Sequence, residues 1–179
     1  MNILDIKDSI QLVFQYWPLI ILLNIYFLYA SYTDIKTMKI YDNFNLLMLV
    51  TRIVSFIIMI CTKQFSWLLF TNYIVGALIM FLAFLIPAMI TWDSIGGDIK
   101  FAFNVGLWVG IVPSLFITLT ATIFNIIWRI LFVGSKDKEP YFKTIAGRPI
   151  FFTAKKRVPL GPFFYFGYIL LGIIYLIIF

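Results

Sequence analysis

The chain has 179 residues, of which 63% are hydrophobic and 12% charged, and its formal net charge is +6. A soluble domain of this length needs more charged residues on its surface than this chain contains. The composition therefore indicates a membrane protein. The chain contains one cysteine and no histidine, which excludes an intramolecular disulfide, a Cys-rich zinc site and histidine-based catalysis. We therefore expect neither a metal nor a cofactor.

Six apolar runs follow one another along the chain, after an amphipathic segment, residues 1–16, that we expect to lie in the membrane interface. The runs are residues 17–33, 44–61, 66–91, 101–112, 114–133 and 160–179. Backbone groups in lipid need hydrogen-bond partners within their own segment, which favours helices. The fourth run is too short to cross a bilayer core of about 30 Å unless its polar start sinks below the head groups. The pattern predicts an all-α polytopic membrane bundle of about six transmembrane helices, forming a single domain over residues 1–179.

The loops between the runs differ in their positive charge. Lys and Arg gather in alternate loops, most densely in the loop 134–158, whereas the opposite side holds only Lys7 and Lys63. Because basic loops stay cytoplasmic, we expect the loop 134–158 inside the cell and both termini outside, in the cytoplasmic membrane. Here the positive charge suits anionic lipid head groups, and we expect no nucleic-acid partner.

Four acidic residues lie at the membrane edges of the first four runs: Asp34, Asp42, Asp93 and Asp98. Ionisable groups at a bilayer boundary are costly and are candidates for function. Two carboxyls held close together share one proton, so one can activate a water while the other polarises a carbonyl. The residues alone leave two structural alternatives open, because Asp98 after Gly96-Gly97 also fits a helix cap and Asp34 also fits a boundary charge.

At these residues the sequence resembles the type IV prepilin peptidases, which include the archaeal preflagellin peptidases. In that family, an aspartate at the end of a span precedes a short spacer and Ile/Leu-Pro-Asp/Asn; here the motif reads Asp34-Ile-Lys-Thr-Met-Lys-Ile-Tyr-Asp42-Asn43. The second motif, Gly-x-Gly-Asp-x-Lys, reads Ile95-Gly96-Gly97-Asp98-Ile99-Lys100. The third, Pro-Phe-Gly-Pro-Phe at the start of the last span, reads Val158-Pro159-Leu160-Gly161-Pro162-Phe163. Two positions depart from the pattern, since Tyr41 replaces a proline and Ile95 replaces a glycine.

The resemblance implies that Asp34 and Asp98 are the catalytic carboxylates of an aspartic-type endopeptidase. Members of the family cleave the leader peptide of pilin-like precursors (prepilins, pseudopilins or archaellins) at the cytoplasmic membrane face. The neighbouring motif positions would then support the site or bind substrate: Gly96, Gly97, Lys100, Asp42 and Asp93. Larger relatives also N-methylate their product with an additional N-terminal region, so we expect this chain to be a short form with peptidase activity only.

Other interpretations of the same residues stay open. The carboxylates would also suit a small ion- or proton-coupled transporter, although such proteins often carry inverted repeats and none is visible here. A purely structural interpretation also stays open for Lys100, Asp42 and Asp93, in which they are only charges at the membrane boundary. Arg52 lies near the middle of the second run, so we expect it to be buried against a partner or a polar cavity rather than lipid, and the sequence does not name that partner.

Overall fold

The structure is a computed structural model, and it describes residues 10, 11, 13, 14, 17–91, 96–128, 142–145, 148–151 and 159–178. Its elements are α2 (Trp17–Thr37), α3 (Asp42–Cys61), α4 (Trp67–Thr91), α5 (Gly96–Val109), α6 (Ile111–Trp128), β1 (Phe142–Ile145), β2 (Arg148–Phe151) and α7 (Gly161–Ile178). Asp93 and most of the segments 1–16 and 134–158 lie outside the described residues.

Five of these helices, α2, α3, α4, α6 and α7, are long and apolar enough to cross a membrane. The sixth, α5, has 14 residues and therefore a length of about 21 Å at 1.5 Å per residue. The predicted all-α polytopic bundle is confirmed, with α5 as its short helix. The strands β1 and β2 pair antiparallel, with Phe142 opposite Phe151, and this small hairpin in the loop 134–158 is not indicated by the apolar runs.

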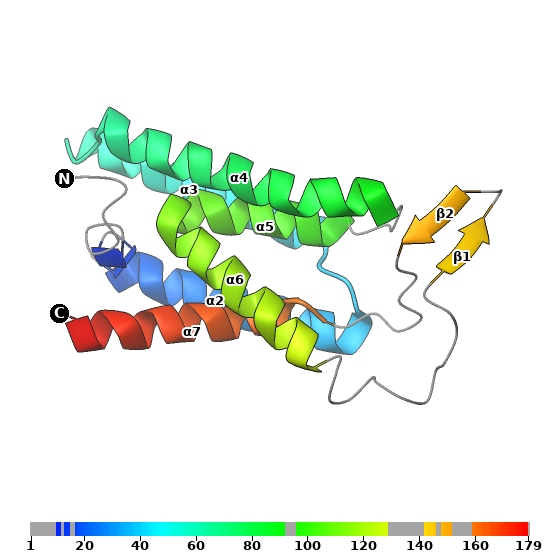
Figure 1. The fold of residues 1–179 in the computed structure, drawn as a ribbon. Helices are drawn as coiled ribbons and strands as arrows, with labels where there is room; N and C mark the ends of the chain where they lie inside the picture. The colour runs from blue at the N-terminus through cyan, green and yellow to red at the C-terminus, as the bar shows by residue number, and fades with distance from the viewer. Residues whose placement is uncertain are drawn as a thin grey trace.

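The helices run back and forth along the bundle (Figure 1). The end of α2, the starts of α3, α5 and α7 and the β1–β2 hairpin lie toward one end of the molecule, whereas the start of α4 and the end of α7 lie at the other. We call the first the Asp34 end of the bundle. The described residues of all three motifs therefore lie toward the Asp34 end.

The short helix α5 is packed between α3 and α4. Gly106 of α5 lies backbone to backbone against Gly76 of α4, an approach that only small residues allow between helices. The chain then turns directly into α6 at Gly110, whose φ of +83° is one that glycine adopts without strain. At this turn the Ile111 N–H donates a 3.1 Å hydrogen bond to Oδ1 of Asn72, which satisfies one of the free N–H groups at the start of α6.

Aromatic rings join the helices that carry the motifs. The ring of Phe101, in α5, lies 5.8 Å from that of Phe27 in α2, 6.4 Å from Phe44 in α3 and 5.7 Å from Phe164 in α7, measured between centroids. All four side chains are buried. This cluster therefore joins α2, which carries Asp34, to α5, which carries Asp98.

Candidate active site

Asp34 lies in the last turn of α2 and is buried, with only 4% of its surface exposed. Its Oδ2 accepts two backbone hydrogen bonds, from the N–H of Leu160 at 2.6 Å and of Gly161 at 2.7 Å. Both donors belong to the start of α7, where N–H groups have no partner within the helix and the helix dipole is positive. The two hydrogen bonds favour a negative charge on Asp34, whereas the burial of the carboxyl group opposes it.

The third motif brings these donors to Asp34. A Cβ added at Gly161 would lie 3.1 Å from the Ala30 carbonyl oxygen and 3.2 Å from the Ser31 Cα, so the absence of a side chain lets the start of α7 approach α2. The sequence identified residues 158–163 only as the third motif. Its role as a hydrogen-bonding cap on Asp34 follows only from the structure.

The segment after Asp34 leads directly to the second motif. Helix α2 ends at Thr37, and Met38 after it adopts a left-handed φ of +53° while its N–H donates to the Asp34 carbonyl oxygen at 2.9 Å. This turn resembles the αL cap that usually requires glycine. It directs the chain so that the Ile40 carbonyl packs on Gly97, where an added Cβ would lie 2.5 Å from the Ile40 oxygen.

Asp98 lies in the first turn of α5 and is half-buried. A helix N-terminus favours a negative charge at this position. The two glycines before it differ, because Gly97 is packed against Ile40 whereas a Cβ at Gly96 would meet nothing within 4 Å. Gly97, and not Gly96, therefore lies in close contact with another backbone segment.

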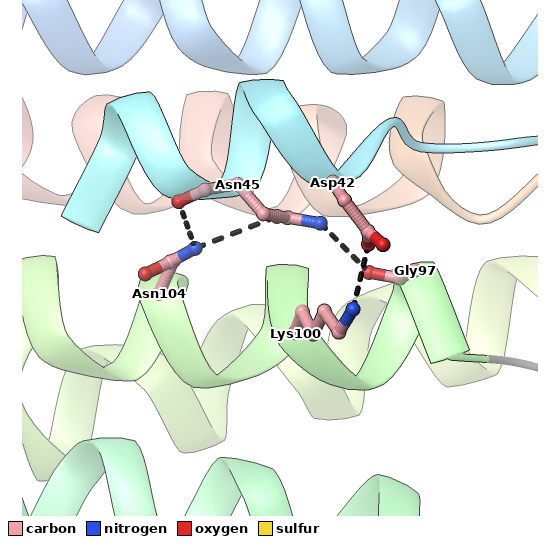
Figure 2. Close-up of polar contacts among 5 residues, drawn as sticks. All are labelled: Asp42, Asn45, Gly97, Lys100 and Asn104. Carbon is pink, nitrogen blue, oxygen red and sulfur yellow. Dashed lines mark hydrogen bonds and ion pairs between the residues drawn. The ribbon is translucent and has the colours of Figure 1, made fainter.

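Lys100 and Asp42 are partners, with a 2.8 Å contact between Nζ and Oδ1 (Figure 2). Their side chains are 54% and 69% exposed, and an exposed ion pair of this kind contributes about 0–1 kcal/mol to stability. The pair joins the starts of α5 and α3, and Lys100 follows Asp98 by two residues in the chain.

The sequence analysis did not identify two buried amides at this α3–α5 contact, Asn45 and Asn104. Asn45 Nδ2 donates to the Gly97 carbonyl at 3.3 Å, and Asn104 Nδ2 donates to the Asn45 carbonyl at 2.9 Å (Figure 2). A signal was available, because Asn45 and Arg52 are two turns apart on one face of an apolar helix and Asn104 interrupts the short apolar run. Within the described residues, no group of three or more His, Cys, Asp and Glu side chains could hold a metal.

These apolar helices are those of a polytopic membrane protein, in which the buried carboxylate of Asp34 and the start of the helix that carries Asp98 lie toward the same end of the bundle. The model of the type IV leader peptidase family matches residues 20–130, a range that contains Asp34, Asp42, Gly97, Asp98 and Lys100. The chain belongs to the type IV leader peptidase family and is a peptidase by that membership, as the resemblance indicated. Among curated proteins and solved structures, no significant match to the chain was found.

Proposed function

We propose that this chain is an aspartic-type endopeptidase that removes the leader peptide of pilin-like precursors, using Asp34 and Asp98. The observation that carries the proposal is the burial of Asp34 under two N–H donors of α7, with Asp98 in the first turn of α5 toward the same end of the bundle. Membership of the leader peptidase family supports the same activity. We place this end at the cytoplasmic membrane face, with the basic loop 134–158 on anionic lipid head groups.

In the proposed reaction the two carboxyls share one proton and hold a water between them. The ionised carboxylate takes a proton from the water as its oxygen attacks the scissile carbonyl carbon, while the protonated carboxyl gives its proton to the carbonyl oxygen. The tetrahedral diol then collapses with cleavage of the C–N bond. The proton taken from the water passes to the leaving amine, and a diol proton returns to the other carboxylate, so the pair again holds one proton.

The hydrogen bonds of Asp34 suggest how it takes part. Both N–H donors of α7 end on Oδ2, so we assign the contact with the water to Oδ1. The donors would keep the Asp34 carboxyl in one orientation throughout the cycle, which is the preorganisation that acid–base catalysis requires.

Co-expression of a pilin-like precursor with wild type, Asp34→Asn or Asp98→Asn tests the proposal. The amide oxygen introduced at position 34 can still accept from the Leu160 and Gly161 N–H groups, so we expect normal membrane insertion but near-complete loss of cleavage, measured as the mobility shift of the precursor. The same Asp→Asn change at Asp137, in the loop 134–158, is the control and should leave cleavage intact. Persistent cleavage by either site variant would remove that aspartate from its catalytic role.

A further inference from the structure

We propose that Asn45 of α3 is a positioning residue, which holds Asp98 in register with Asp34. The proposal rests on the proposed function and adds a residue that none of the three motifs contains.

Asn45 contacts α5 at two levels. Only 4% of its surface is exposed, and its Nδ2 donates to the Gly97 carbonyl at 3.3 Å. The Asn104 amide, two turns further along α5, donates to the Asn45 carbonyl at 2.9 Å and lies 3.4 Å from Asn45 Oδ1. Figure 2 shows Asn45 between these two contacts. Asn45 therefore fixes both the depth and the rotation of α5 against α3.

Further polar contacts continue along the same face of α3. Trp108 Nε1 donates to the Met48 carbonyl at 3.1 Å, and Arg52 Nε donates to the Leu107 carbonyl at 3.0 Å. A helix held at several levels cannot slide or rotate without breaking buried hydrogen bonds, and a buried group left without a partner is destabilising. Asn45 is the member of this row that contacts the start of α5.

The Gly97 carbonyl is the group through which this contact reaches the site. It belongs to the peptide unit that joins Gly97 to Asp98, so its position limits where the Asp98 side chain can begin. On its other side Gly97 packs against the Ile40 carbonyl, which follows Asp34 by one short connection. Asn45 therefore holds the start of α5 against the segment that leads from Asp34.

Catalysis is sensitive to small errors in this position. A displacement of about 1 Å can lower a rate by about 100-fold, and a displaced Asp98 could no longer share a water with Asp34. Substrate binding would change less, because it depends on a larger surface than one carboxyl group. A positioning role therefore predicts a selective loss of kcat.

The first test compares Asn45→Leu with Asn125→Leu in a cleavage assay on purified protein in lipid vesicles. Asn125 is a buried amide of α6 that makes no hydrogen bond to α3 or α5 within the described residues, so it controls for loss of a buried amide. We expect Asn45→Leu to lower kcat by about 10- to 100-fold with KM within about threefold. The reason is that a misplaced Asp98 would stabilise the transition state less well while substrate binding would change little. A kcat within twofold of wild type, or a loss equal to that of Asn125→Leu, would overturn the proposal.

The second test does not depend on activity. Asp34→Cys and Asp98→Cys are combined in a Cys61→Ser background, and thiol cross-linkers of graded length are applied to membranes with Asn45 or with Asn45→Leu. We expect the shortest effective linker to give a several-fold lower yield with Asn45→Leu. Equal yields would overturn the positioning role alone. No cross-link with any reagent in the presence of Asn45 would also overturn the carboxylate pair and, with it, the proposed function.

Discussion

Arg52 shows how a single cation is accommodated inside an apolar bundle. Its surface is 1% exposed, and its Nε donates to the Leu107 carbonyl at 3.0 Å. The guanidinium carbon lies 4.0 Å from the ring centroid of Tyr73 and 4.5 Å from that of Phe56, which are cation–π distances. The Leu107 carbonyl belongs to the last turn of α5, where the helix dipole is negative and favours a cation. Ring faces and the end of a helix thus surround a charge for which the sequence named no partner.

These contacts predict that Arg52→Lys destabilises the protein more than Arg52→Met. Lysine keeps the charge that must be desolvated but loses the planar stacking and the Nε donor, whereas methionine removes the charge and fills most of the space. We expect Arg52→Lys to lose about 1–3 kcal/mol, measured as a lower apparent melting temperature in detergent. If Arg52→Lys were the milder change, the charge rather than the planar group would be what the site requires.

The burial of Arg52 could be predicted from the sequence, but its environment could not. A charge in the middle of an apolar run must face the protein interior, and this follows from α3 alone. Tyr73 lies on α4 and Leu107 on α5, so identifying them requires knowledge of how three helices pack. Asp34 is a parallel case, because its hydrogen-bond donors Leu160 and Gly161 are remote in the chain.

Helix α5 is the element on which the candidate site most depends. Its N-terminal half carries Asp98 and Lys100, and contacts with α3 and with the segment after α2 fix its start. The sequence correctly indicated a short helix opened by Gly96-Gly97. It did not separate the two glycines, because the difference between them is the Ile40 carbonyl, a contact made by another part of the chain.

We predict that Gly97→Ala destabilises the protein whereas Gly96→Ala does not. The Cβ at position 97 would lie 2.5 Å from the Ile40 oxygen, while at position 96 it would meet nothing within 4 Å. Because the obstacle is backbone, Gly97→Ala requires α5 to move and should lose about 1–3 kcal/mol. Gly96→Ala should change stability by no more than about 0.5 kcal/mol. Thermal unfolding of the two variants in the same detergent provides the measurement, and equal losses would contradict the packing of Ile40 on Gly97.

The bundle as a whole places the basic residues of the first two motifs toward one end. Lys36 lies in the last turn of α2 and Lys100 near the start of α5, whereas Lys63 lies in the turn after α3. The sequence predicted that these lysines lie at different ends of the bundle, because successive membrane-spanning helices run in opposite directions and place alternate loops at the same end. The short hairpin β1–β2 was not predicted, since apolar periodicity identifies spans but carries no information on polar loops.

This division predicts an orientation in the membrane, which can be measured with two matched variants. Lys36→Cys and Lys63→Cys, each in a Cys61→Ser background, replace exposed lysines toward opposite ends of the bundle. Because basic loops remain cytoplasmic, we expect a membrane-impermeant maleimide outside right-side-out vesicles to label position 63 and not position 36. Inverted vesicles should give the opposite pattern, and detergent should expose both positions. Labelling of position 36 from outside would place Asp34 and Asp98 at the outer face, where a peptidase could not meet a precursor before its translocation.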